Sequence, residues 1–360
     1  MSSESLTTSA SFSSQVTANK SVVTNDFILE PSVSKYIRLV LTAIVLFVAV
    51  VSNSIVLRIV FSKLPNRKPV IYILIGNLAA AELGQTALQP FLLYYEETWE
   101  WIYGDFLCHV MYPLQAVCMA NITQTLAGIA VYRYLITVSP IWPTRASTVK
   151  MILLLTSFWC VGVAISLPSA VTRKIFPCER QPKKKCCGEV FRDPSAQLKY
   201  AVAFDVVVNL VPMFTMVLAY ILVGIKIRWH LKTLRRVHNF SDESNARQTT
   251  LPLEVRSVNN IKKTIKTRNT EGNIENAGLI SEMEKSLMKM MYIIVLSFIV
   301  CYLPYEICYH LYQRGILRRW KYGGIVSMYA LWLILVPSAL HPFLYGTRNK
   351  FLRKAFFAFC

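Results

Sequence analysis

Residues 106–138 read FLCHVMYPLQAVCMANITQTLAGIAVYRYLITV, and this stretch decides the fold. Arg133 is the only charged residue (Asp, Glu, Lys or Arg) in this stretch. A bilayer core about 30 Å thick needs roughly 20 apolar helical residues per crossing, because a helix satisfies its own backbone N–H and C=O groups there. The stretch therefore predicts a membrane-spanning helix.

Six other stretches of comparable length and apolar character lie around this one. The seven expected spans have approximate limits 36–61, 70–94, 106–138, 148–171, 197–227, 284–313 and 322–345. The whole chain is 54% hydrophobic and only 16% charged, whereas soluble domains carry about 25% charged residues. Since the first five spans are joined by short connections, we expect one all-α membrane bundle of seven helices over residues 36–345.

The segments outside the spans are polar or amphipathic. Residues 1–35 form an expected extracellular tail, and Asn19 lies in an N-glycosylation triplet. Residues 229–283 form an expected cytoplasmic loop, disordered in part, because its middle holds few bulky apolar residues. Residues 346–360 place apolar side chains at helical spacing between basic ones, which predicts a short amphipathic eighth helix; Cys360 at its end is a palmitoylation candidate.

Basic residues indicate the orientation of the chain in the membrane. The formal net charge is +19, but in a membrane protein such charge first reports topology, so nucleic acid is not an expected partner. Arg58 and Lys63 flank the first connection, and Arg348 and Lys350 follow the last span. The positive-inside rule places both regions in the cytoplasm and the N-terminus outside. No secretory signal peptide is visible, so the first span is expected to target the chain to the plasma membrane.

Five short motifs lie in five different spans. They are Ser52-Asn53-Ser54-Ile55-Val56, Asn77-Leu78-Ala79-Ala80-Ala81-Glu82-Leu83, Tyr132-Arg133-Tyr134, Cys301-Tyr302-Leu303-Pro304 and His341-Pro342-Phe343-Leu344-Tyr345. Together with Trp159 and Pro212 they resemble the rhodopsin-like (class A) G-protein-coupled receptors, and the chain is closest in character to the peptide receptors. The resemblance covers residues 37–359.

The resemblance implies a receptor that binds an extracellular ligand and activates heterotrimeric G proteins when the sixth helix moves outward. The residues that would form this switch are Arg133, Glu284, Tyr220, Phe298, Pro304 and Tyr345. Arg133 paired with Glu284 would hold the resting state, because a buried cation needs a partner. Arrestin and receptor kinases are further expected partners, beside the lipid bilayer.

Two departures from the family pattern concern buried polar residues. Tyr132 replaces the acidic neighbour of Arg133, which removes one restraint on that arginine and predicts raised basal signalling. Glu82 and His341 replace the usual Asp and Asn, beside the buried anchor Asn53. We expect Glu82 and His341 to form a hydrogen-bonded pair in place of a sodium site.

The ligand expected from the sequence is a charged peptide. Gln115 stands where amine receptors carry Asp, and no lysine for a retinal Schiff base lies between residues 323 and 346. Asp205 and Glu306 are acids at the depth of the family's pocket, and intramembrane acids default to functional sites. The expected ligand-binding residues are Gln115, Asp205, Glu306, Tyr302 and Tyr309. A small amine or metabolite is the alternative ligand.

Cysteines mark the expected outer mouth of the receptor. The resemblance implies a disulfide between Cys108 and Cys187, and Cys178 with Cys186 would then close a hairpin that carries Lys183 to Lys185. Adjacent Cys186 and Cys187 leave the pairing open. The acids Glu96, Glu97, Glu100 and Asp105 lie on the neighbouring connection, so a bipolar mouth is expected.

Two other classes of protein have weaker support. An intramembrane enzyme needs a nucleophile with a base or paired metal ligands, yet His109, His310 and His341 lie in different elements. No enzyme activity, cofactor or metal site is therefore expected. A channel needs a continuous polar path, whereas the polar residues here fall at switch positions; a channel or transporter stays the alternative of another class.

Overall fold

The computed structural model describes residues 30–62, 69–138, 148–178, 181–248, 292–294, 296–312 and 314–348. Within this part of the chain, seven helices are long and apolar enough to cross a membrane. The all-α bundle of seven spans predicted from the sequence is confirmed.

The first four spans are single helices: α2 (Ser32–Ser62), α3 (Val70–Thr98), α4 (Gly104–Val138) and α5 (Thr148–Thr172). The fifth is built from α6 (Pro194–Asp205), the π-helix η1 (Val206–Leu210) and α7 (Val211–Gln248). The sixth span is Tyr292–Tyr312, called here the sixth helix. A short helix α9 (Ile316–Arg319) leads to the seventh, which consists of α10 (Gly323–Leu333) and α11 (Val336–Arg348).

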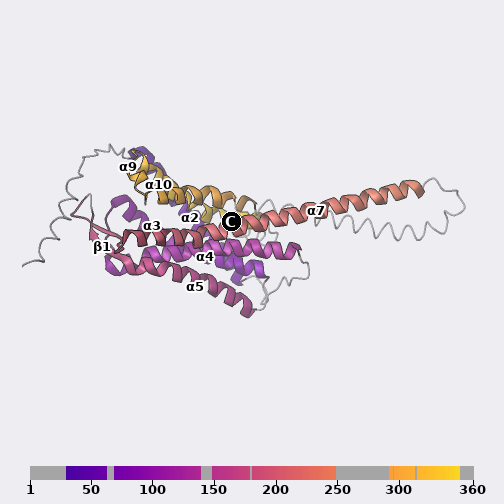
Figure 1. The fold of residues 1–360 in the computed structure, drawn as a ribbon, viewed down its shortest axis with the longest axis horizontal. Coiled ribbons are helices and arrows are strands. Elements are labelled where there is room, and N and C mark those ends of the chain that lie inside the picture. The colour runs from indigo at the N-terminus through magenta and orange to yellow at the C-terminus, as the bar shows by residue number, and fades with distance from the viewer. Residues whose placement is uncertain are drawn as a thin grey trace, which may run out of the picture.

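The helices run side by side as one elongated bundle with α4 in contact with α3, α5 and α7 (Figure 1). One end carries an antiparallel hairpin of β1 (Arg173–Pro177) and β2 (Lys185–Glu189). We call this the hairpin end, and the opposite end, where α4 finishes, the Arg133 end. The α7 helix extends far beyond the bundle at the Arg133 end (Figure 1).

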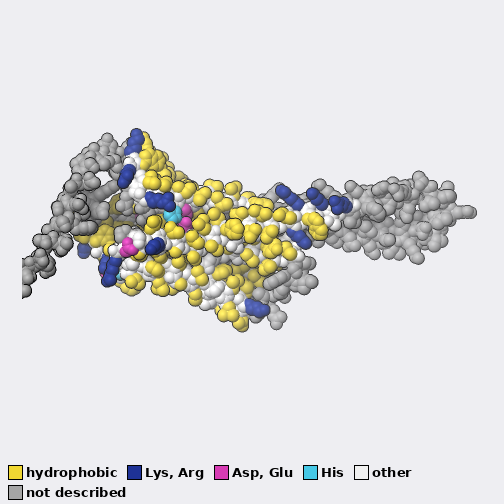
Figure 2. Space-filling view, viewed as in Figure 1, with side chains coloured by type: hydrophobic (Ala, Val, Ile, Leu, Met, Phe, Trp, Pro, Cys, Tyr) yellow, Lys and Arg dark blue, Asp and Glu magenta, His cyan; other side chains and the backbone are white. Residues whose placement is uncertain are grey.

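The interior and the outer surface of the bundle are both apolar. Leu74, Ile122 and Met216 are among the fully buried side chains, while Phe47 and Phe61 are about 70% exposed (70% and 72%). Figure 2 shows hydrophobic side chains over the middle of one face and Lys and Arg side chains towards both ends. An apolar belt between two charged zones fits a bilayer, where lipid tails cover such side chains.

The fifth span differs from the expected 197–227 in two ways. Asp193 caps its start, because its carboxylate accepts hydrogen bonds from the side chain and backbone N–H of Ser195, which hold the pKa of Asp193 below its usual value. Its end lies at Gln248, well past residue 229, where the cytoplasmic loop was expected to begin. No Gly or Pro occurs between Lys226 and Gln248, so nothing in that stretch stops the helix.

Candidate functional site

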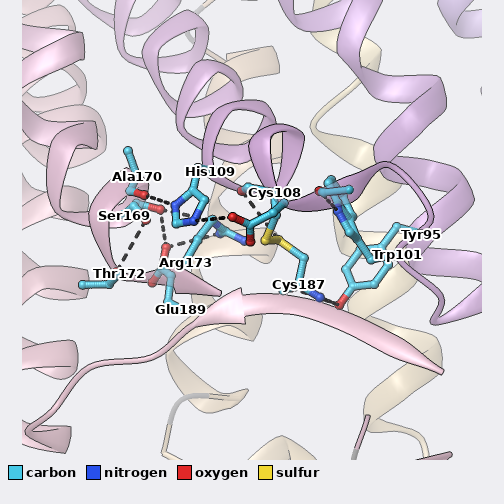
Figure 3. Close-up of a disulfide and its surroundings, with 12 residues drawn as sticks. Tyr95, Trp101, Cys108, His109, Ser169, Ala170, Thr172, Arg173, Cys187 and Glu189 are labelled. Atoms are coloured by element: carbon cyan, nitrogen blue, oxygen red, sulfur yellow. Dashed lines mark hydrogen bonds and ion pairs between the residues drawn. A yellow bond between two sulfur atoms is a disulfide. The ribbon is translucent and has the colours of Figure 1, made fainter. Parts of the chain in front are cut away.

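Two disulfides hold the hairpin against the bundle. Cys108 at the start of α4 is bonded to Cys187 on β2, with their Cα atoms 5.8 Å apart, and Cys178 is bonded to Cys186. Figure 3 shows the Cys108–Cys187 disulfide between the start of α4 and strand β2, with the backbone N–H of Cys187 donating a hydrogen bond to the Tyr95 hydroxyl. The Tyr95 hydroxyl in turn donates to the Cys187 carbonyl. Both pairings are those that the sequence favoured.

A buried ion pair joins the two strands of the hairpin to α4. The Arg173 guanidinium donates to Glu189 Oε1 at 3.2 Å, and the side chains of the two residues are 12% and 16% exposed. Arg173 also lies over the ring of Tyr112, 4.0 Å from its centroid, while Glu189 accepts from the Ser169 hydroxyl (Figure 3). This cation is therefore fully partnered within the chain.

The acids near the hairpin end are mostly neutralised by the chain itself. Glu97 binds Lys35 and Arg38 at 2.8 and 2.7 Å, and Lys184 lies 3.9 Å from Glu100. The bipolar mouth expected from the sequence is therefore reduced, because these charges pair with one another. The sequence places them far apart, so only the packing of α2, α3 and the hairpin brings them together.

A second polar cluster lies between the fifth and sixth spans. His310 Nε2 is 3.0 Å from Asp205 Oδ2, and Asn209 Nδ2 donates to Asp205 Oδ1 at 3.0 Å and to Glu306 Oε1 at 2.7 Å. One carboxylate oxygen each of Asp205 and Glu306 lie within 4.8 Å of each other, close enough for the two groups to interact electrostatically. In the described part of the chain, no Lys or Arg forms an ion pair with either acid. The structure thus brings the two predicted acids into one group.

His310 and Asn209 were not among the predicted site residues. A signal for both existed, since Asp205 and Asn209, like Glu306 and His310, stand four positions apart and share one helix face. The π-helix η1 lies between Asp205 and Val211 and adds a wider turn at this point. Such turns occur frequently at functional sites.

The other predicted ligand-binding residues lie at different depths. Gln115 Nε2 donates to Gln89 Oε1 at 3.1 Å, which ties α4 to α3. Tyr309 lies beside His310, with ring centroids 5.8 Å apart. Tyr302 is only 2% exposed and stacks on Phe298 at 4.3 Å, so it belongs to the core below the cluster.

Asn53, Glu82 and His341 form a buried polar layer in the middle of the bundle. His341 Nδ1 and Glu82 Oε1 share a hydrogen bond, and both side chains are 1% exposed. Asn53 Nδ2 donates to the carbonyl of Ser338 at 2.9 Å, so α2, α3 and α11 are linked by polar contacts. The hydrogen-bonded pair expected from the sequence is present.

Arg133 lies among phenol groups at the Arg133 end. The side chains of Tyr220, Tyr132 and Tyr72 are close enough to interact electrostatically with it. Its Nε is buried and has no hydrogen-bond partner among the described residues. Pro304, another predicted switch residue, lies in the sixth helix, half-buried.

Four predicted residues cannot be placed. Glu284, Asn19 and Cys360 lie outside the described residues, as does the eighth helix beyond Arg348. The backbone of Tyr345 belongs to α11, but its side chain is not among those described.

Comparison with known proteins agrees with this geometry. The family model for the 7 transmembrane receptor (rhodopsin family) matches residues 52–345. The chain is 27% identical over 319 residues to the neuromedin-K receptor of Cavia porcellus, covering 87% of this chain and 62% of the relative. It is 25% identical over 341 residues to the neuromedin-K receptor of Homo sapiens, covering 93% and 63%.

A second kind of receptor also matches most of this chain. The QRFP-like peptide receptor of Branchiostoma floridae is 23% identical over 329 residues, which cover 90% of this chain and 77% of the relative. The chain spans 62% to 66% of the length of the neuromedin-K receptors that it matches. With seven membrane-spanning helices and a family match over most of its length, the chain belongs to the rhodopsin family of seven-transmembrane receptors and is a multi-pass membrane receptor, not an enzyme.

Proposed function

We propose that this chain is a receptor for a cationic peptide and that it activates heterotrimeric G proteins. The observation that carries the ligand proposal is the pair of acids Asp205 and Glu306. Two carboxyl groups this close in an apolar bundle repel each other unless a proton or a cation lies between them. A lysine, arginine or N-terminal amine of a peptide supplies that cation.

The orientation proposed for the receptor follows from its disulfides and its basic residues. Disulfides form in oxidising compartments, so the hairpin end and the N-terminus face the cell exterior. The basic helix extension with Lys226, Arg228 and Lys232 then lies in the cytoplasm, as the positive-inside rule requires. The receptor thus lies in the plasma membrane, and Asp205 and Glu306 lie towards the exterior side of its bundle.

The signalling step proposed at the other end is an outward movement of the sixth helix. Arg133 with its phenol neighbours Tyr132 and Tyr220 supplies the group that changes partner. In the resting state Glu284 binds Arg133, and in the active state the phenols of Tyr220 and Tyr345 surround it. Phe298 and Tyr302 transmit ligand binding through the core, since they stack directly below the acid cluster. Arrestin and receptor kinases follow as partners of the active state.

The ligand proposal is tested with a panel of cationic and neutral peptides on cells that express the receptor. Asp205→Asn and Glu306→Gln keep the size of the side chain and remove one charge each. We expect each to raise the EC50 of an active cationic peptide by roughly 10- to 100-fold, the equivalent of a partly desolvated charge pair. Asp193→Asn is the matched control, because Asp193 is an exposed acid at the same end and asparagine caps a helix as well as aspartate does, so the EC50 of this variant should stay unchanged.

Two outcomes contradict the ligand proposal. Equal potency in wild type and both variants means that the acids do not meet the peptide. A response to small amines, with none to peptides, identifies the alternative ligand class.

G-protein activation is tested without any ligand. We expect the wild type to activate at least one G-protein subtype above mock-transfected cells, because Tyr132 leaves Arg133 with one restraint fewer. Glu284→Ala should raise this basal signal and Arg133→Ala should abolish it at matched surface expression. A wild-type signal equal to that of mock-transfected cells would contradict the prediction of basal activity.

A further inference from the structure

Three side chains of metal-binding types converge where the fifth span faces the sixth. One ligand atom each from Asp205, Glu306 and His310 lies within 4.8 Å of the other two. We propose that this cluster binds a divalent transition-metal ion, Zn²⁺, between the fifth and sixth spans.

The donor set selects the kind of metal. An imidazole nitrogen with two carboxylates suits Zn²⁺, whereas Ca²⁺ and Mg²⁺ prefer oxygen ligands throughout. Three protein ligands leave the fourth tetrahedral position open, as in zinc sites that keep a water or a substrate group. A water molecule or a donor group of the receptor's ligand therefore completes the coordination.

The geometry requires little movement. Tetrahedral zinc with bonds of about 2.0–2.1 Å holds its ligand atoms about 3.3 Å apart. His310 Nε2 and Asp205 Oδ2 are already 3.0 Å apart. Glu306 and His310 project from the same face of the sixth helix, so a rotation of the Glu306 side chain closes the remaining distance. The side chains of His310 and Asp205 are 24% and 14% exposed, so the rest of the chain does not fully enclose them.

Asn209 carries an unsatisfied amide oxygen beside the cluster, and this oxygen could serve as a further cation ligand. It is only 5% exposed, and its Oδ1 is buried with no hydrogen-bond partner in the described part of the chain. Its Nδ2 lies between Asp205 and Glu306. Turning the amide would direct Oδ1 at both carboxylates, an arrangement that becomes favourable when a positive ion lies among the three groups.

Charge balance favours the same conclusion. With both acids ionised and the imidazole neutral, the cluster would carry a net charge of about −2, and each proton that these groups hold lowers that negative charge by one. In the lipid-covered part of a membrane protein such charge is costly unless it is compensated. Zn²⁺ neutralises the cluster and at the same time joins two helices that the proposed switch must move relative to each other. The ion and a peptide cation would compete for the same carboxylates.

The test uses the purified full-length receptor in detergent, with Zn²⁺ and then Co²⁺ as probes. Equilibrium dialysis should find one Zn²⁺ per receptor, and Co²⁺ should give the visible absorption of a tetrahedral site. Excess Ca²⁺ should not displace either ion. Binding is measured without peptide or G protein, so its failure leaves the proposed receptor function standing, and failure of the peptide assay leaves the metal site standing.

Substitutions locate the site. His310→Ala and Glu306→Gln should each weaken Zn²⁺ binding by roughly 10- to 100-fold or more, since even second-shell changes have such effects. His109→Ala is the matched control, because His109 also lies four residues from an acid, Asp105, but has no third metal ligand nearby among the described residues. This variant should bind Zn²⁺ as the wild type does.

Glu306→Gln separates loss of metal binding from loss of folding, because glutamine can still accept the hydrogen bond from Asn209. The circular dichroism spectrum of this variant should match that of the wild type. The proposal is overturned if the wild type binds no Zn²⁺, or if His310→Ala and Glu306→Gln bind it as tightly as His109→Ala does.

Discussion

Among the described residues, two pairs of a carboxylate and an imidazole join helices, and they differ in their surroundings. Glu82 of α3 binds His341 of α11 in the middle of the bundle, where both side chains are 1% exposed. Asp205 of α6 binds His310 of the sixth helix towards the hairpin end, where the side chains are 14% and 24% exposed. The same chemical pair thus occurs once as a closed pair, which is fully buried, and once as an open pair, which is partly exposed.

The difference between the pairs shows how surroundings separate a structural contact from a binding site. The closed pair has one acid, one histidine and a further polar neighbour in Asn53, and Glu82 Oε2 has no hydrogen-bond partner among the described residues. The open pair has a second acid, Glu306, that the described residues do not neutralise. A surplus of acid within the membrane-spanning part is compensated either by a proton or by a partner from outside the chain.

The largest effect is expected from breaking the closed pair. His341→Ala leaves the Glu82 carboxyl in a fully buried position without its partner, which costs about 3–5 kcal/mol of stability. The measurement is the melting temperature of the receptor purified in detergent, which should fall by many degrees.

The double variant Glu82→Leu with His341→Leu sharpens this test. Removing both partners leaves no orphaned charge, so it should recover most of the stability that His341→Ala loses. A double variant as unstable as His341→Ala would show that Glu82 and His341 stabilise the receptor through more than their mutual hydrogen bond.

A smaller effect is expected from breaking the open pair. His310→Ala leaves Asp205 with Asn209 as a hydrogen-bond donor, so the stability of this variant in metal-free buffer should fall by only about 1 kcal/mol. Melting curves recorded beside those of His341→Ala compare the two pairs directly. Equal losses in the two variants would contradict the distinction drawn between them.

The smallest effect is expected at the stacked aromatic residue between the pairs. The Tyr302 hydroxyl is buried and has no hydrogen-bond partner among the described residues. Tyr302→Phe removes this unsatisfied group and keeps the stacking on Phe298, so stability should be unchanged or rise by about 1 kcal/mol. A clear loss of melting temperature would reveal a partner for the hydroxyl, such as an ordered water.

Much of the architecture was readable from the residues alone. The apolar stretches predicted seven spans, because a bilayer leaves a chain few other ways to satisfy its backbone. The limits of α3 and α4 differ from the expected ones by no more than a few residues, 70–98 against 70–94 and 104–138 against 106–138. Resemblance to a family predicted the Glu82–His341 pair and the Cys108–Cys187 disulfide, since motif order fixes which helices face each other.

The polar networks at the hairpin end were decided only by the tertiary structure. The sequence shows Glu97 and Arg38 as separate charges, and packing of α2 on α3 makes them neutralise each other. Asp205 and His310 are likewise 105 residues apart in the sequence. Hydrophobicity determines that a segment enters the membrane. Which polar side chains meet inside the bundle depends on how each helix is rotated about its axis and on the π-helix η1 in the fifth span. Hydropathy along the chain does not encode that rotation, so the cluster proposed to bind both peptide and metal became visible only in three dimensions.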